Sequence, residues 1–258
     1  MKIYIHTDLE GISGIDTAGV EEKNHPGYRH AVERLMSDLN AAVDGAFAGG
    51  ATHVTVLDSH GGGGNFDLSL LDKRADNDPR ANKQWWGKLD DTYAGTFFIG
   101  AHAMAGTQNG FLDHTDDSLR WLNYYVNNRR MGELGMWAMV AGHFNVPMLM
   151  VAGDEAACVE ARQFFDPVEC AAVKRGVGRS RAILVDPSEA TERIRAAARQ
   201  ALRLVGTARP FKPHLPMEVK LELTRSDYCD ALAENPRNER LDARTVRKFC
   251  ASYLELAL

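Results

Sequence analysis

Five acidic and histidine side chains within the first 133 residues have the types and spacing of a metal site. They are Asp8, Glu10, His60, His102 and Glu133. Imidazoles and carboxylates are ligands that zinc and similar divalent ions accept. Two or more carboxylates in one pocket repel each other unless protons or cations neutralise them. If the fold brings these side chains together, a metal site is the expected result.

The number of candidate ligands favours two metal ions over one. Five ligands are too many for a single tetrahedral ion that keeps an open position. They suit two ions about 3.5 to 4 Å apart that share a bridging carboxylate. Asp8 is the natural bridge, because it lies nearest to the end of its predicted strand. Each residue alone could be a capping or surface residue, so the prediction depends on their joint position at the ends of elements.

The pattern of apolar residues explains why these side chains should meet. Apolar runs at residues 2–5, 53–57 and 95–99 predict strands, and candidate ligands follow each run. Glu133 begins a predicted helix over residues 133–143. In open α/β sheets, ligands bind outside the carboxyl ends of the strands. We therefore expect all five side chains at one edge of a sheet.

The remaining elements continue an alternation of strands and helices. This order predicts an α/β fold with a three-layer, mostly parallel sheet core and right-handed crossovers. The further predicted elements are a helix over 30–48, a hairpin around 119–127, a strand over 146–151, a helix over 154–165 and an extended segment over 168–174.

The alternation of strands and helices is interrupted near residue 190. A predicted helix over 187–205 is followed by a linker that contains Pro210, Pro213 and Pro216. We expect a catalytic α/β domain over 1–190 and a smaller C-terminal α+β subdomain over 191–258. Its predicted elements are a strand over 217–224, a helix over 226–233, a strand over 244–249 and a last helix that reaches residue 258.

Composition excludes several classes of function. The 258 residues are 45% hydrophobic and 25% charged, which are ordinary globular values. The formal net charge of −5 gives no electrostatic reason to expect a nucleic-acid or membrane partner. Asp8 and Glu10 interrupt the stretch where a signal peptide would need its apolar core. Four widely spaced cysteines favour free thiols, and we expect a soluble, cytoplasmic protein.

His114 is a candidate catalytic residue. It lies twelve residues after His102 in a loop that leaves the same predicted sheet edge. From there an imidazole could donate a proton to the substrate or stabilise an oxyanion, although a solvated loop histidine would look the same. The nearby run of glycines at 61–64 lacks the Lys-Ser/Thr of a phosphate loop, so we interpret it as a flexible neighbour of His60.

Several of these segments together resemble the D-aminopeptidase family, from residue 3 to about residue 181. The matching motifs are Asp8-Leu9-Glu10-Gly11-Ile12-Ser13-Gly14, Asp58-Ser59-His60, Leu89-Asp90-Asp91-Thr92, Gly100-Ala101-His102-Ala103, His114, Gly132-Glu133-Leu134-Gly135 and Val146-Pro147-Met148-Leu149-Met150-Val151-Ala152-Gly153-Asp154.

The resemblance implies a zinc metallo-aminopeptidase or amidase that acts at the N-terminus of short peptides, including those of D-amino acids. It implies two zinc ions per subunit, with Asp8 as the bridge and His114 as the catalytic residue. It also implies a ring-like homo-oligomer, commonly a decamer, whose active sites face an inner chamber. The ligands it implies are Asp8, Glu10, His60, His102 and Glu133.

Trp85 and Trp86 depart from the resemblance, because family members tend to have a smaller, more apolar segment here. These two side chains could form a wall of the substrate pocket, a contact between subunits or ordinary packing. The departure concerns the substrate and leaves the chemistry unaffected.

Two other functions fit parts of the sequence. Asp8-x-Glu10 after a first strand, with Asp154 after a later one, imitates a haloacid-dehalogenase-type phosphatase. That family needs a second Asp where Glu10 stands and has no use for His60 and His102. The other alternative is a non-catalytic oligomeric protein that keeps the metal site as a structural element.

Overall fold

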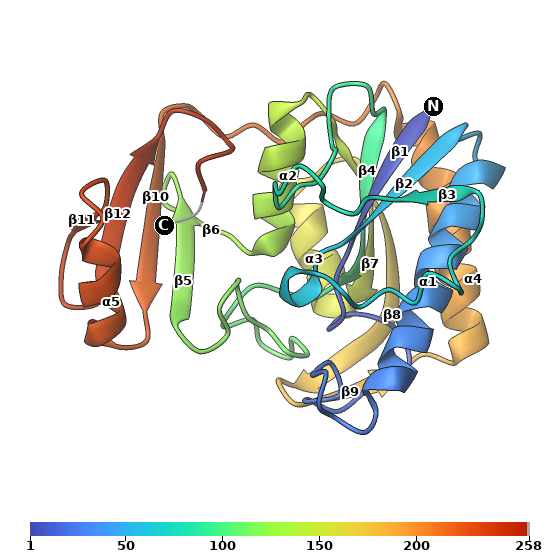
Figure 1. Cartoon of the computed structure of the whole chain (residues 1–258), viewed down its shortest axis with the longest axis horizontal. Coiled ribbons are helices and arrows are strands. Elements are labelled where there is room, and N and C mark those ends of the chain that lie inside the picture. The colour runs from blue at the N-terminus through green and yellow to red at the C-terminus, as the bar shows by residue number, and fades with distance from the viewer. Residues whose placement is uncertain (257–258) are drawn as a thin grey trace.

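A seven-stranded sheet forms the centre of the computed structural model, which describes residues 1–256 (Figure 1). Its strands lie in the order β3-β2-β1-β4-β7-β8-β9, and every neighbouring pair is parallel except β8 and β9. The predicted α/β class with a mostly parallel sheet is therefore confirmed. The strands are β1 (Lys2–Thr7), β2 (His53–Asp58), β3 (Ala75–Asn77), β4 (Gly95–Ala101), β7 (Met148–Asp154), β8 (Glu169–Gly178) and β9 (Arg181–Leu184).

Helices cover both faces of this sheet and give it three layers (Figure 1). On one face, α1 (Tyr28–Ala48) and α4 (Pro187–Ala201) pack against each other and against the strands. On the other face lie α2 (Glu133–His143) and α3 (Glu155–Phe164). The inner strands are buried on both sides, which explains their continuous apolar runs.

A second, antiparallel sheet lies beside the first (Figure 1). Its order is β11-β12-β10-β5-β6, so the hairpin from the middle of the chain joins the C-terminal strands. The side chains of β10 alternate between buried and half-buried, as expected for a sheet with one covered face. The elements are β5 (Trp121–Val126), β6 (Arg129–Arg130), β10 (Met217–Leu223), α5 (Ser226–Ala233), β11 (Glu239–Arg240) and β12 (Thr245–Cys250).

Helix α2 contributes to the cores of both sheets. Trp137 and Ala138 pack with side chains of the main sheet, whereas Met139 and Val140 pack with those of the second sheet. A helix that is buried on opposite sides must be apolar all round. This explains why α2 lacks the polar stripe that α1 and α4 show.

The structure departs from the predicted elements in the C-terminal segment. The predicted last helix is absent from residues 251–256, which form turns, and residues 257 and 258 lie outside the described part. A helix this short is marginal unless packing supports it. Here the buried side chains of Tyr253 and Leu256 fill the core of the second sheet instead. The predicted helix over 187–205 ends at Ala201 and continues as a 3₁₀ turn over Leu202–Leu204.

The short strands β3, β9 and β11 were not predicted, because each has four residues or fewer. The predicted domain boundary at residue 190 falls within α4, and the division into two domains stays a prediction. Within residues 1–256, no helix combines the length and the apolarity that crossing a membrane requires.

Candidate active site

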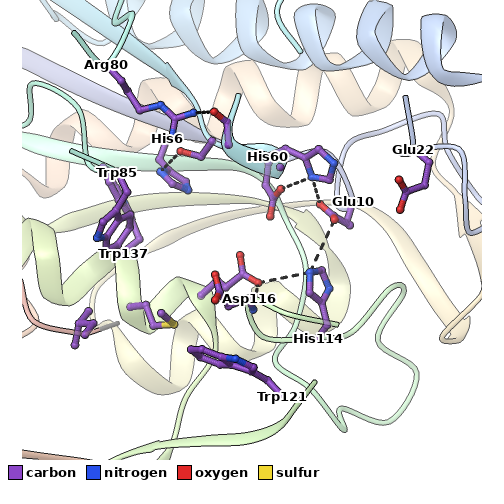
Figure 2. A pocket seen from close by; sticks show the side chains of 17 residues that line it. His6, Glu10, Glu22, His60, Arg80, Trp85, His114, Asp116, Trp121 and Trp137 are labelled. Carbon is purple, nitrogen blue, oxygen red and sulfur yellow. Dashed lines mark hydrogen bonds and ion pairs between the residues drawn. The ribbon is translucent and has the colours of Figure 1, made fainter. Parts of the chain in front are cut away.

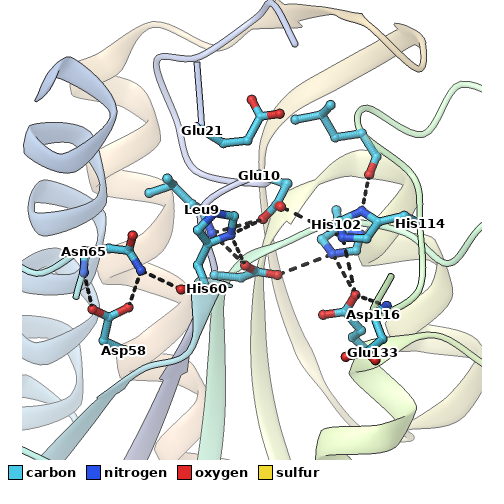
Figure 3. A network of polar contacts seen from close by, with 12 residues as sticks. Leu9, Glu10, Glu21, Asp58, His60, Asn65, His102, His114, Asp116 and Glu133 are labelled. Atoms are coloured by element: carbon cyan, nitrogen blue, oxygen red, sulfur yellow. Dashed lines mark hydrogen bonds and ion pairs between the residues drawn. The ribbon is translucent and has the colours of Figure 1, made fainter. Parts of the chain in front are cut away.

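All six residues singled out in the sequence meet at the carboxyl edge of the main sheet (Figure 3). Asp8 and Glu10 follow β1, His60 follows β2, and His102 follows β4. Glu133 begins α2, and His114 comes from the loop between β4 and β5. The predicted convergence at one edge is therefore observed.

Close backbone contacts between strand ends hold this edge together. The Asp8 amide donates to the Ile99 carbonyl, and the Gly11 amide donates to the Gly100 carbonyl, each at 2.8 Å. Gly100 has a φ of +82°, and a Cβ there would lie 2.0 Å from the Asp8 carbonyl oxygen. Only glycine allows the end of β4 to approach the Asp8 loop this closely.

The first group of candidate ligands contains Asp8, Glu10 and His60. The Nδ1 atom of His60 lies 3.1 Å from Asp8 Oδ1 and 3.1 Å from Glu10 Oε2. The three side chains offer ligand atoms that lie within 4.8 Å of one another. Such a cluster can hold one divalent ion.

The second group contains His102, Glu133 and His114. His102 Nε2 lies 3.3 Å from Asp8 Oδ2 and 3.4 Å from Glu133 Oε1. The Nδ1–H of His102 donates to the Ala103 carbonyl at 3.1 Å, which leaves a lone pair on Nε2. Among the described residues, this buried Nε2 has no hydrogen-bond partner. An unpartnered, buried imidazole nitrogen between two carboxylates fits a metal ligand.

Asp8 connects the two groups. Its Oδ1 faces His60 and its Oδ2 faces His102, so each oxygen points to a different cluster. This is the arrangement that a carboxylate bridging two ions requires.

His114 lies at the edge of the second group. Its Nδ1–H donates to the Leu112 carbonyl at 2.7 Å, and its Nε2 lies 3.6 Å from Glu133 Oε1. The ring stacks on that of His102, with centroids 4.0 Å apart and an interplanar angle of 7°. The free Nε2 of His114 can therefore exchange a proton with a substrate or complete the second group as a ligand.

The three carboxylates of the cluster need positive charge nearby to balance their own. Burial alone would raise the pKa of Asp8, but the adjacent imidazoles of His102 and His60 hold that pKa well below its usual value. Burial opposes protonation of His60, yet hydrogen bonds to Asp8 and Glu10 raise its pKa to about 11. In the metal-free protein, protonated imidazoles therefore balance the charge of the carboxylates. Divalent ions would compete with these protons for the same atoms.

Four polar residues outside the predicted ligand set form hydrogen bonds next to the candidate ligands. Asp58 accepts hydrogen bonds from the amide and the side chain of Asn65, whose side chain also donates to the His60 carbonyl. The fully buried Lys174 donates to the Glu10 carbonyl at 2.8 Å. Glu160 accepts from the Met104 amide at 2.7 Å. Lys174 follows the apolar residues 170–173, and a lysine at the end of such a run is the signal that could have identified it.

A pocket of about 600 Å³ opens in front of the cluster (Figure 2). This volume is within the range of small-molecule sites, about 300 to 1,000 Å³. The candidate ligands line one side, the indole rings of Trp85 and Trp137 line the other, and Trp121 lies below Asp116, near His114. Trp85 packs edge-on against Trp86 and Trp137, with centroid distances of 5.9 and 6.1 Å. Trp85 thus belongs to the pocket wall, whereas Trp86 packs behind it.

Comparison with known proteins identifies the family. The sequence profile of the peptidase family M55, described as D-aminopeptidase, matches residues 1–257. This chain belongs to the D-aminopeptidase family. A D-aminopeptidase of Bacillus subtilis (strain 168) is 34% identical over 256 residues, which cover 97% of this chain and 92% of the relative.

The fold agrees with this membership. A solved structure described as the Zn-dependent D-aminopeptidase DppA from Bacillus subtilis, a self-compartmentalizing protease, superposes with a TM-score of 0.93. It is 30% identical, and the match covers 99% of this chain and 94% of that one. The resemblance to the family is confirmed, and the chain is a peptidase, a hydrolase of peptide bonds. The comparisons do not favour the phosphatase or the non-catalytic alternative.

Proposed function

We propose that this protein is a two-zinc aminopeptidase that removes the N-terminal residue of short peptides, including peptides of D-amino acids. The observation that carries the proposal is the Asp8 carboxylate, whose two oxygens face two separate groups of candidate ligands. The Zn-dependence stated for the Bacillus subtilis structure supports zinc as the metal.

In this proposal Asp8, Glu10 and His60 hold one ion, and Asp8, His102 and Glu133 hold the other. Bound zinc supplies Lewis-acid chemistry, which makes water a nucleophile near neutral pH and polarises a carbonyl group. The three carboxylates supply the negative charge that balances the bound cations. The hydrogen bond from His102 to the Ala103 carbonyl fixes the ring so that Nε2 faces the ligand groups.

His114 acts as the catalytic residue in the proposal. The Leu112 carbonyl holds the proton on its Nδ1, so Nε2 is the atom that faces the substrate. A protonated Nε2 donates a hydrogen bond to the developing oxyanion or a proton to the leaving amine. The alternative role, a ligand in the second group, predicts a different result for its removal.

The test compares metal content and activity on paired D- and L-amino-acid amides. Chelation should abolish hydrolysis, and added zinc should restore it. His114→Ala should keep two zinc ions per chain while turnover falls about 10²- to 10⁴-fold. The exposed His30 on α1 provides a matched control, since His30→Ala removes an imidazole that does not line the pocket. Full activity of the metal-free protein would refute the proposal, and loss of zinc from His114→Ala would make His114 a ligand.

A second variant tests the bridge. Asp8→Asn should lower zinc content at both sites, because one carboxylate serves both groups. His60→Ala should lower it mainly at the first site. Elemental analysis gives the zinc content per chain of each purified variant, and Asp8→Asn should lose more zinc than His60→Ala. Equal loss in the two variants would contradict a bridging role for Asp8.

The proposal includes assembly into a ring-like homo-oligomer, specifically a decamer with its active sites facing an inner chamber, in a cytoplasmic protein. The self-compartmentalizing description of the similar structure supports the assembly, and four free cysteines agree with a reducing compartment. Native mass spectrometry should find ten chains per particle. A monomeric mass for an active preparation would refute this part alone.

A further inference from the structure

The pocket in front of the candidate ligands is divided by charge. Carboxylates gather on the side of Glu10 and Glu133, where Asp116 and Glu22 also line it. Arg80 lies on the opposite side, beside His6 and above Trp85 in the view of Figure 2. Among the described residues that line the pocket, Arg80 is the only one with a guanidinium or ammonium group.

Arg80 has no carboxylate partner within residues 1–256. Its guanidinium donates to the Gly62 carbonyl, and no ion pair in the described chain involves it. The side chain is half-buried at the border of the pocket. A guanidinium has five N–H donors, so most of its hydrogen-bonding capacity remains for a ligand, and a carboxylate matches its geometry.

Apolar side chains line much of the pocket beside the two charged sides. Trp85 and Trp121 are half-buried, and Met136, Trp137 and Leu256 line the same pocket. Aromatic rings give a large apolar contact area, and they pack well against other rings. This wall therefore suits a large apolar group that lies between the metal site and Arg80.

We propose that the preferred substrates are dipeptides whose free carboxylate binds Arg80 and whose second residue packs a large apolar side chain against Trp85. The N-terminal residue then lies at the carboxylate-rich side, where the scissile bond faces the metal site. The leaving residue occupies the aromatic side. This inference rests on the aminopeptidase function proposed above and adds to it the class of the leaving residue.

The polarity of the pocket decides which end of the peptide lies where. A dipeptide at neutral pH carries a positive amine at one end and a negative carboxylate at the other. Reversing it would place the amine beside the Arg80 guanidinium and the carboxylate beside Asp116 and Glu22, the lining carboxylates that are not proposed metal ligands. Like charges in a partly desolvated pocket repel strongly, so only one orientation is favourable.

The test measures kcat/KM of the zinc-loaded enzyme on four substrates of the configuration that it accepts. These are alanyl-phenylalanine, alanyl-phenylalanine amide, alanyl-alanine and alanine amide. We expect the free acid to exceed its amide by about 30-fold, because a close charge pair at an interface contributes about 2 kcal/mol or more. We expect alanyl-phenylalanine to exceed alanyl-alanine by about tenfold.

Two variants locate these preferences. Arg80→Ala should lower kcat/KM far more for the free acid than for the amide, so that the two substrates react at similar rates, and Arg80→Lys should recover part of the preference. Trp85→Ala should reduce the preference for phenylalanine over alanine. Retained zinc and amide hydrolysis show that each variant is folded. Arg203→Ala, at an exposed arginine outside the pocket, is the control.

The results distinguish a failure of this inference from a failure of the proposed aminopeptidase function. If no substrate, including alanine amide, is hydrolysed, the proposed function fails. If the amide and the acid react equally well, or if Arg80→Ala slows both equally, the carboxylate site is wrong and the peptidase function stands. A change of particle mass in Trp85→Ala with unchanged selectivity would make Trp85 a subunit contact and overturn the aromatic wall.

Discussion

Glu160 is a buried carboxylic acid beside the candidate metal site. One of its oxygens accepts the Met104 amide, and the other has no hydrogen-bond partner among residues 1–256. Burial raises the pKa of Glu160 to about 7, although the Met104 hydrogen bond acts in the opposite direction. The neutral acid is therefore the form that the fold favours.

This pKa has a consequence for stability. Because the folded-state pKa is above the unfolded value of 4.5, the contribution of Glu160 is complete below that pH and is lost as pH rises through about 7. A shift of this size corresponds to roughly 3 kcal/mol. Glu160→Gln keeps the shape of the side chain but cannot ionise. In metal-free protein, its free energy of unfolding should fall less between pH 5 and pH 8 than that of the wild type.

Urea unfolding at several pH values checks this expectation. Glu155→Gln, at an exposed position on the same helix, serves as the control and should follow the wild type. If the Glu160 and Glu155 variants show the same pH dependence, the carboxyl group of Glu160 is ionised in the folded protein and the expectation fails.

At the scale of residues, the sequence was sufficient to find the candidate site but not its supports. Asp8, Glu10 and His60 follow recognisable strands, and parallel strands bring their carboxyl ends to one edge. Lys174 and Glu160 lie on a strand and a helix whose chain distance from the site is large. Their role depends on which atoms they meet across the sheet edge, and apolar periodicity does not contain that information.

Gly100 shows how one element depends on another at the site. Its Cα–H faces the Asp8 carbonyl so closely that an added Cβ would lie 2.0 Å from the oxygen. Gly100→Ala should push the Asp8 loop away from β4 and separate His102 from Asp8. We expect a loss of at least about 2 kcal/mol in the free energy of unfolding, together with reduced zinc content.

Gly206→Ala separates the two causes of this loss. Gly206 has a φ of +84°, but a Cβ there would meet no atom within 4 Å. The control therefore includes the cost of the left-handed conformation without the collision. Urea unfolding and elemental analysis measure both variants. Equal effects would show that the approach of β4 to the Asp8 loop is not tight.

Most helices were predicted closely, whereas the shortest strands and the final segment were not. Helices α2 and α5 begin and end at the predicted residues. The prediction of a final helix was wrong, because burying Tyr253 and Leu256 in a core stabilises the chain more than an isolated turn of helix would. The pairing of β5 with β10 joins residues about a hundred positions apart, and no local pattern indicates it.

At the scale of the whole molecule, the two sheets are expected to unfold together. Both depend on α2, so loss of one core exposes the apolar surface of the helix that supports the other. Hydrogen exchange followed by mass spectrometry through a urea transition should give the same midpoint for β4 and β10. An earlier midpoint for β10 would contradict this expectation and support an independent subdomain over residues 191–258.

The position of α2 between two cores also sets the mutational tolerance of the chain. Helix α4 buries one stripe, which includes Ala190, Ile194 and Ala198, and exposes the rest. In a saturation scan, α4 should therefore alternate between sensitive and permissive positions at helical period. Helix α2 has no such permissive stripe from Leu134 to Gly142, apart from the half-buried Met136 in the pocket wall. Variation that adapts this protein to new substrates is thus confined, along α2, to that one position.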